Sequence, residues 1–195
     1  MIVVDSRGHG RSTRDARPYS YDLMAADVLA LMDHLGIAKA SIVGWSDGGI
    51  IGLDIAMNHP ERNDRLFAFG ANSNIAGLKE GIDQNPTFAA FIEQAGKDYE
   101  RLSPTPGEYD AFLEQIGAMW ASQPNWTAEQ LARIKAPTVI ADGEHDEAIR
   151  PEHTAELARQ VPGAKLLILP GVSHFAMWQN PAQFNAAILE FLAGG

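Results

Sequence analysis

A serine stands between glycines in residues 44–49, where the sequence reads Gly-Trp-Ser-Asp-Gly-Gly. An apolar run precedes this stretch and residues with helical spacing follow it, which predicts a strand, a tight turn and a helix. A Gly-x-Ser-x-Gly turn presents a serine hydroxyl for nucleophilic attack, because its glycines leave room for a sharp bend. We therefore expect Ser46 to be a nucleophile. The alternative is a closely packed turn in which Ser46 only caps the helix.

The start of this predicted helix would also assist the chemistry. The positive end of a helix dipole favours an oxyanion that forms beside it. We predict that the backbone N–H of Asp47, the residue after the serine, donates a hydrogen bond to that oxyanion.

A serine hydroxyl is a weak nucleophile until a base accepts its proton, and that base is commonly a histidine oriented by a carboxylate. Of the six histidines, His174 alone directly follows a predicted strand end, in a loop ahead of a final helix over residues 181–192. We expect His174 to be the base. Four other histidines lie in a glycine-rich loop, on or at the end of a helix, or after a proline, and we interpret them as structural or solvated: His9, His34, His59 and His153.

An acidic loop follows the predicted strand at residues 138–141 and offers four carboxylates. We predict that Asp146 orients the histidine, with Asp142 as the second choice. Taken alone, this loop also fits a solvated surface turn. The chain order of serine, acid and histidine favours the catalytic interpretation.

Aromatic and methionine side chains occur near these candidates and predict an apolar pocket. They fit an ordinary core equally well. The predicted substrate-binding residues are Trp45, Asp47, Met119, Trp120 and Phe175.

The amino-acid composition limits the classes of partner and cofactor that we expect. The 195 residues are 46% hydrophobic, enough for one core, and the net charge of −10 disfavours nucleic acid and anionic membranes as partners. The absence of cysteine excludes disulfides and thiolate metal sites, and the predicted chemistry needs no metal or organic cofactor. No stretch approaches the roughly 18 apolar residues of a membrane span, and no basic leader precedes the first apolar run. We expect a soluble cytoplasmic protein that acts on a small molecule.

The candidates must be positioned by the elements around them. Short runs rich in Val, Ile and Leu predict buried parallel strands, and helical spacing appears between them, for example over residues 21–35, ending at Gly36. This alternation predicts an α/β fold with a doubly wound, mostly parallel sheet and chemistry at the carboxyl ends of the strands. The predicted strands are residues 2–4, 40–43, 66–69, 138–141 and 165–169.

The alternation breaks down between residues 74 and 133, where aromatic residues, Gly and Pro occur among helical stretches. We expect an inserted helical cap over residues 74–133. The core would then consist of residues 1–73 and 134–195.

Four motifs in this order resemble the α/β-hydrolase family: residues 5–12, the turn at residues 44–49, residues 143–146 and residues 171–174. Together they cover nearly the whole chain. The resemblance implies Ser46 as nucleophile, Asp146 as orienting acid and His174 as base, the same residues that the chemistry indicates. It also implies that residues 74–133 are the cap.

The serine turn is similar to that of the valacyclovir hydrolase, or biphenyl hydrolase-like, group. In that group an acidic residue after the serine is associated with amino-acid ester substrates, so the resemblance implies that Asp47 could meet a substrate ammonium group. The alternative is an acidic side chain that the helix N-terminus favours.

The resembling family carries three further strands ahead of the one predicted at residues 2–4, and the loop after the third supplies a second oxyanion donor. We therefore expect an N-terminally truncated α/β-hydrolase fold with a gap between residues 2–4 and 40–43, where unpaired strand edges are costly. The flanking strands could close up, a second copy could supply an edge in a homo-oligomer, or the chain could be a fragment. Loss of one oxyanion donor costs roughly 100 to 1,000-fold in rate, so we expect weak activity.

The function expected is hydrolysis of a small ester or related acyl compound through an acyl-enzyme. Two alternatives stay open: a cofactor-free perhydrolase, haloperoxidase or carbon–carbon bond hydrolase, and an inactive remnant that serves in binding or assembly.

Overall fold

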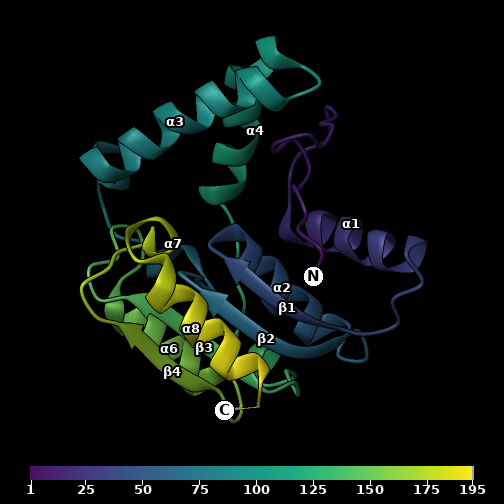
Figure 1. Cartoon of the computed structure of the whole chain (residues 1–195), viewed down its shortest axis with the longest axis vertical. Coiled ribbons are helices and arrows are strands. Elements are labelled where there is room, and N and C mark those ends of the chain that lie inside the picture. The colour runs from purple at the N-terminus through teal and green to yellow at the C-terminus, as the bar shows by residue number, and fades with distance from the viewer. Residues whose placement is uncertain (195) are drawn as a thin grey trace.

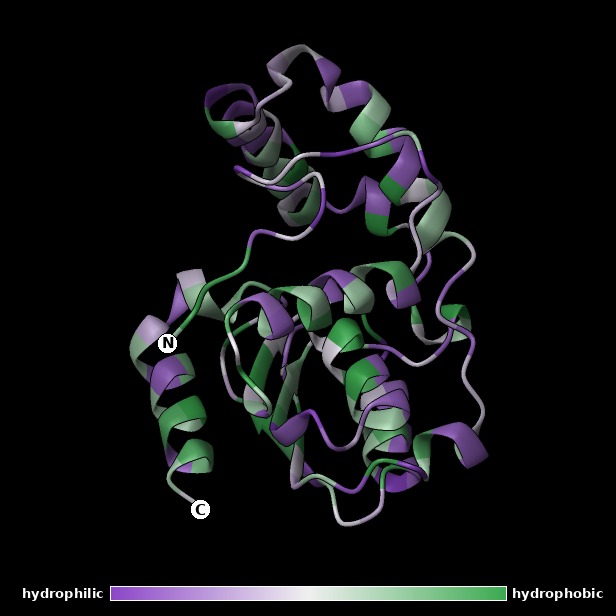
Figure 2. Ribbon diagram, turned by 90° about the vertical axis from the view of Figure 1, so that its right-hand side faces the viewer, coloured by the Kyte–Doolittle hydropathy of each residue, from purple (hydrophilic) through white to green (hydrophobic). Residues whose placement is uncertain are grey.

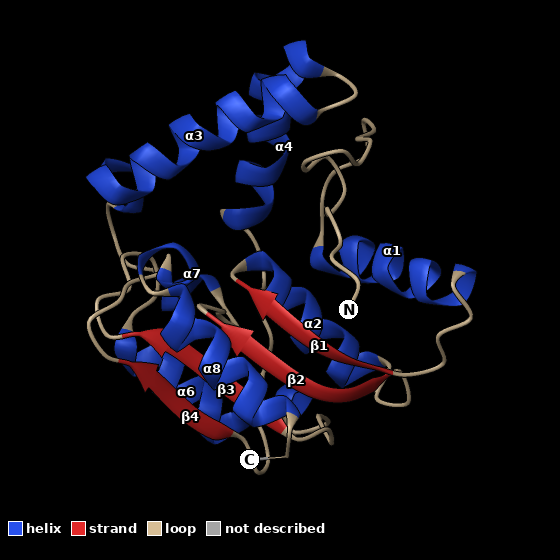
Figure 3. Ribbon diagram, viewed as in Figure 1, coloured by secondary structure: helices blue, strands red, loops and turns tan. Residues whose placement is uncertain are grey.

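A computed structural model describes residues 1–194 and shows a four-stranded parallel sheet in the order β1-β2-β3-β4. The predicted doubly wound α/β class is confirmed, since helices cover both faces (Figures 1 and 3). The strands, which match four of the five predicted runs, are β1 (Ala40–Trp45), β2 (Asn63–Phe69), β3 (Thr138–Gly143) and β4 (Lys165–Leu169).

The central strand β2 is apolar on both faces because each face packs against helices. Leu66 and Ala68 join a cluster with helices α2 (Asp47–Asn58) and α6 (Pro151–Gln160). Phe67 and Phe69, on the opposite face, pack with helix α8 (Pro181–Leu192). Alternate side chains of one strand therefore build both halves of the core.

Helix α1 (Tyr21–His34) packs against α2 and is capped at its N-terminus by Ser20, whose side chain accepts a hydrogen bond from the Leu23 N–H. The chain leaves the helix through Gly36, which has a φ of 68°. A positive φ is inexpensive only for glycine, so the predicted end of this helix is confirmed.

Residues 74–133 add no strand to the sheet, and their two longer helices, α3 and α4, stand beyond the carboxyl ends of the strands (Figures 1 and 3). The rings of Tyr99 and Tyr109 each stack on Phe112 where these helices meet. The segment consists of η1 (Ile75–Gly77), η2 (Ile82–Gln84), α3 (Pro86–Leu102), η3 (Pro106–Glu108), α4 (Tyr109–Trp120) and α5 (Ala128–Leu131).

The prediction of a strand at residues 2–4 is wrong. These residues form no strand, and Val3 is 82% exposed; the apolar stretch is visible as a loop leading from the N-terminus in Figure 2. An apolar run becomes a strand only when a neighbouring backbone pairs with it, and β1 pairs with β2 alone. Residues 2–4 and β1 therefore do not pair with each other, and β1 is an edge strand.

Within residues 1–194, no helix combines the length and the apolar character needed to cross a membrane.

A buried acid at the contact between α1 and α2 makes the stability depend on pH. Asp54 is 3% exposed and its Oδ2 atom has no hydrogen-bond partner, and burial, together with the nearby Asp22 carboxylate, raises the pKa of Asp54 to about 7. The folded state thus holds a proton that the unfolded state releases near its ordinary pKa of 3.8.

We expect the free energy of unfolding to fall as the pH rises from about 4 to about 7, because the folded state binds more protons over that interval. Asp54→Asn should remove this decrease and raise the melting temperature at pH 8. Urea unfolding at several pH values measures the effect, with the exposed Asp64→Asn as control. Parallel pH curves for wild type and Asp54→Asn would contradict the prediction.

Candidate active site

The turn between β1 and α2 holds Ser46 in a strained conformation. Its φ of 52° and ψ of −121° make it the one non-glycine residue of positive φ among residues 1–194. Such backbone costs of the order of 1–3 kcal/mol and persists only where its surroundings fix it. The Ser46 N–H donates to the Phe69 carbonyl at 2.8 Å, and the Ile50 N–H donates to the Ser46 carbonyl at 3.1 Å.

The Ser46 hydroxyl makes no capping hydrogen bond to α2. Ser46 is the N-cap residue of α2 by position, but its side chain does not serve as a cap. The hydroxyl stays available at the carboxyl end of β1, and the side chain is partly exposed.

Gly44 explains why the turn needs small residues. A Cβ atom there would lie 2.2 Å from the backbone carbon and oxygen of Gly48 and 2.4 Å from the Gly49 nitrogen. A Cβ atom on Gly48 would meet nothing within 4 Å. The first glycine of the pattern is thus required by close approach of the chain, whereas the second is not.

Asp146 and His174 are brought together from two loops. Asp146 Oδ2 lies 2.6 Å from His174 Nδ1, and the two residues are 4% and 2% exposed. Asp146 Oδ1 accepts the N–H groups of Ala148 and Ile149 at 2.6 and 2.7 Å. Burial alone would raise the pKa of Asp146, but the hydrogen bond and charge of His174 and the surrounding donors lower it to about 2. The carboxylate is therefore ionised and can hold the imidazole in one tautomer.

The His174 ring lies beside the end of β2 and beside Trp45, the residue before Ser46. A Cβ atom on Gly70, at the end of β2, would be 2.8 Å from His174 Cε1. Trp45, next to the serine, has its ring centroid 5.4 Å from that of His174, tilted by 54°, and donates from Nε1 to the His174 carbonyl at 2.6 Å. Within residues 1–194 no hydrogen bond joins the Ser46 hydroxyl to His174, and contacts of this kind often tighten only when substrate binds.

Two further acids of the loop after β3 hold the histidine loop in place. Glu147 accepts the backbone N–H of His174 at 3.0 Å, and Glu144 accepts that of Gly171 at 2.9 Å. Gln179 completes the arrangement by accepting the Ser173 N–H at 2.7 Å. We did not predict these roles from the sequence, where the only signal was the acidic composition of the loop.

Asp142, the second choice for the orienting acid, points to other partners. Its Oδ1 accepts the Gly143 N–H at 2.8 Å and its Oδ2 pairs with the Thr154 hydroxyl at 2.7 Å. One atom each from Asp142, Asp146 and His174 lie within 4.8 Å of one another, a spacing that could hold a metal ion. The direct contact between Asp146 and His174 already serves an acid and base pair.

Asp47 does not present a free carboxylate. It accepts hydrogen bonds from the Tyr21 hydroxyl at 2.7 Å and from Trp120 Nε1 at 2.9 and 3.1 Å. Burial, followed by the charge of Asp47, raises the pKa of Tyr21, so this hydroxyl remains a donor. The Asp47 side chain therefore connects the end of α4 to the serine turn. Its backbone N–H belongs to the first residue of α2.

The chain that carries these site residues matches the alpha/beta hydrolase family over residues 1–187. This chain belongs to that family. The serine hydrolase BPHL of Mus musculus is 27% identical over 202 residues, covering 98% of this chain and 69% of the relative. A 2-hydroxy-6-oxo-6-phenylhexa-2,4-dienoate hydrolase of Burkholderia cepacia is 28% identical over 221 residues, covering 100% of this chain and 77% of the relative.

A solved structure of the meta-cleavage product hydrolase CumD from Pseudomonas fluorescens IP01, with acetates bound, has the same fold. It aligns with a TM-score of 0.80 at 22% identity, covering 96% of this chain and 77% of that one. The resemblance to α/β hydrolases, including the biphenyl hydrolase-like group, is thus confirmed, as is the assignment of the chain to this class of enzymes.

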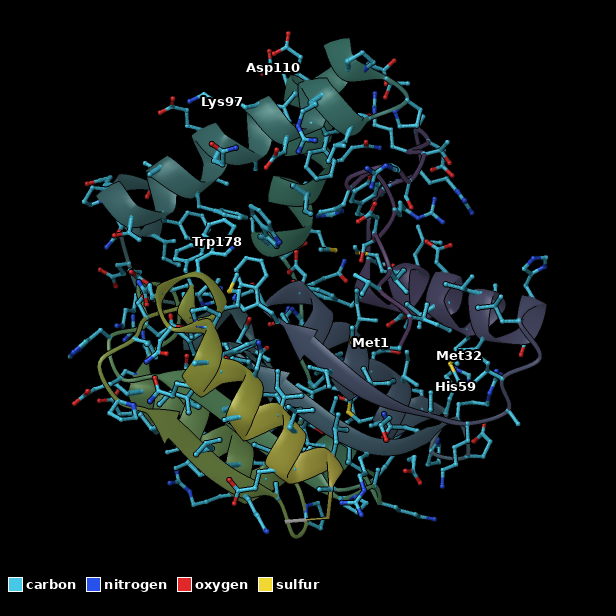
Figure 4. The ribbon with its side chains drawn as sticks, viewed as in Figure 1. Met1, Met32, His59, Lys97, Asp110 and Trp178 are labelled. Atoms are coloured by element: carbon cyan, nitrogen blue, oxygen red, sulfur yellow. The ribbon has the colours of Figure 1, made fainter. Side chains whose placement is uncertain are left out.

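In this α/β hydrolase, aromatic rings cover the histidine. Phe175 packs 5.8 Å from Trp45, and Phe91 of α3 lies 5.6 Å from Trp45 and 5.2 Å from Phe175. Trp178 of α7 (Ala176–Gln179) stacks on Phe175 and lies beneath α3 in Figure 4. Met119 is instead buried in the main core.

A cavity of about 180 Å³ opens between α3, α4 and the loop near Gly10. Phe91 and Trp178 line it and also belong to the aromatic cluster beside His174. Its remaining lining residues are His9, Gly10, Gln94, Ala95, Asp98, Tyr99, Tyr109 and Phe112.

The four histidines that we interpreted as structural or solvated bind other groups or face solvent. His153 is buried and its Nε2 accepts the Ser73 N–H at 3.0 Å, while burial lowers the pKa of His153. His9 bonds the Arg7 carbonyl through Nδ1. His34 and His59 are exposed.

Substitution of the two turn glycines tests the packing argument. Gly44→Ala should cost about 2–3 kcal/mol of stability, because the added methyl overlaps backbone that cannot move freely. Gly48→Ala, the matched control, should stay within about 1 kcal/mol of wild type, since it sits in a helix with open space around it. Chemical denaturation measures both values, and equal losses would show that the close approach at Gly44 does not constrain the turn.

Proposed function

We propose that this α/β hydrolase is a serine hydrolase that cleaves a small ester or related acyl compound, with Ser46 as nucleophile, His174 as base and Asp146 as the acid that orients it. The observation that carries the proposal is the buried 2.6 Å contact between Asp146 and His174, whose ring lies 5.4 Å from that of Trp45, the residue before the strained Ser46. Strain at a functional residue is typical of a nucleophile held in position for attack.

The reaction follows from these positions. His174 accepts the proton of the Ser46 hydroxyl while the oxygen attacks the acyl carbon, and the ionised Asp146 stabilises the imidazolium that results. The backbone N–H of Asp47, at the start of α2, donates to the oxyanion. His174 then protonates the leaving group, and water releases the acyl group from Ser46 by the same proton route.

The aromatic cluster around His174 supports an apolar substrate. Trp45, Phe91 and Phe175 exclude water from the reacting groups, which strengthens electrostatic interactions there. The Asp47 carboxylate is already hydrogen-bonded by Tyr21 and Trp120, so a substrate ammonium would compete with two existing donors. We therefore favour neutral acyl substrates over amino-acid esters.

A carbon–carbon bond hydrolase is the second candidate, because the Burkholderia cepacia relative carries a dienoate hydrolase name at 28% identity. The same triad would serve that reaction. Mass spectrometry of the products from ester and vinylogous diketone substrates separates the two activities.

Labelling with a fluorophosphonate probe tests the nucleophile. The folded protein should gain one adduct by intact mass, and Ser46→Ala should gain none, because the probe forms a covalent bond only with an activated serine. Ser41→Ala, which changes an exposed serine of β1, is the control and should label normally. An adduct on Ser46→Ala, or none on folded wild type, would refute the assignment.

The orienting acid is tested by the labelling rate. Asp146→Asn should slow labelling by about 10³–10⁴-fold, because an amide stabilises the wrong tautomer of His174. Asp83→Asn, an exposed acid of η2, should leave the rate unchanged. A rate within twofold of wild type for Asp146→Asn would exclude this acid.

A further inference from the structure

Asp142 is a buried acid next to the proposed catalytic pair that the mechanism above does not use. It is the fifth residue of β3 and lies in the same cluster as Asp146 and His174, with one ligand atom of each within 4.8 Å of the others. The Gly143 N–H and the Thr154 hydroxyl of α6 fix the plane of its carboxyl group. These two donors therefore fix the rotamer and orientation of the Asp142 side chain from two sides.

The two carboxyl groups cannot both be charged at this distance in a buried site, because a single imidazole faces them. The donors favour Asp146 as the ionised partner, since it receives the N–H groups of Ala148 and Ile149 as well as His174. Asp142 receives one N–H and one hydroxyl. Burial, then the hydrogen bond and charge of Asp146, raise the pKa of Asp142 to about 9.

We propose that Asp142 is a positioning residue that acts as a neutral carboxylic acid, donating a hydrogen bond to the Asp146 carboxylate and holding that carboxylate toward His174. The effect of this hydrogen bond on catalysis rests on the proposed function, whereas the hydrogen bond itself does not. Thr154 and the Gly143 N–H hold Asp142, Asp142 holds Asp146, and Asp146 holds the imidazole.

The charged groups around Asp142 allow the pH dependence to be worked out. Asp146 and His174 face it directly, the Lys79 ammonium donates to the Asp146 main-chain carbonyl, and Glu147 accepts the His174 N–H. On α6 the neighbour of Thr154 is His153, which is bound to Ser73. Ionisation of Asp142 at alkaline pH adds a second negative charge beside Asp146, so it should break the hydrogen bond between the two acids.

Carboxyl-carbon NMR of aspartate-labelled protein tests the proposal without requiring turnover. The Asp142 signal, assigned by its loss in Asp142→Asn, should remain that of a neutral acid up to about pH 9, while Asp146 stays ionised down to about pH 2. Asp142→Asn should leave the His174 ring signals at neutral pH unchanged, because the amide still donates to Asp146. Asp142→Ala should raise the pKa of Asp146 and shift the His174 ring signals.

Labelling by the fluorophosphonate probe gives the functional consequence. Asp142→Ala should label about 10-fold more slowly than wild type, as expected for the loss of one hydrogen bond to a charged group. Asp142→Asn should restore the rate and should lack the decline above about pH 9 that ionisation of Asp142 causes in wild type. Glu152→Gln, an exposed acid on α6, controls for the change of charge.

An Asp142 signal that titrates near the ordinary value of about 4 would overturn the proposal. So would identical His174 ring signals in the alanine and asparagine variants. If no serine labels, the proposed hydrolase activity fails, but the carboxyl titration and the His174 ring signals still decide the role of Asp142. If Asp142→Ala does not fold, the wild-type carboxyl signal and Asp142→Asn decide it.

Discussion

The hydrogen bond between Asp146 and His174 connects two loops that follow different strands, β3 and β4, and it is buried from solvent. A buried ionised carboxylate is tolerated only when hydrogen bonds replace its lost hydration. Backbone N–H groups and the imidazole supply those bonds here, and Glu147 and Glu144 hold the histidine loop against the acidic loop. The position of the candidate base therefore depends on the satisfaction of one buried charge.

The parallel sheet is what allows these loops to meet. Parallel strands end at the same edge of a sheet, so the serine turn after β1 and the loops after β3 and β4 converge there although they are distant in sequence. Core packing on both faces keeps the strand ends in register: Phe67 and Phe69 pack toward α8, while Leu66 and Ala68 pack toward α2 and α6. Stability and site geometry thus have the same source.

Residues 74–133 are joined to the serine turn by more than chain connectivity. Trp120 of α4 donates to Asp47, and Phe91 of α3 packs on Trp45, so both helices contact residues that flank Ser46. Movement of these helices would disturb the turn directly. Asp47 consequently couples the insertion to the nucleophile, which its position in the sequence motif does not suggest.

The sequence by itself determined the α/β class and four of the five strands, and it predicted Ser46 and His174, with Asp146 preferred to Asp142 as the acid, because short apolar runs and the Gly-x-Ser-x-Gly turn are local properties of the chain. It could not decide the conformation of residues 2–4, since an apolar run becomes a strand only through a partner. It also left open which acid of the loop after β3 faces the imidazole. That choice, and the engagement of Asp47 by Tyr21 and Trp120, depend on side chains that only the tertiary structure brings into contact.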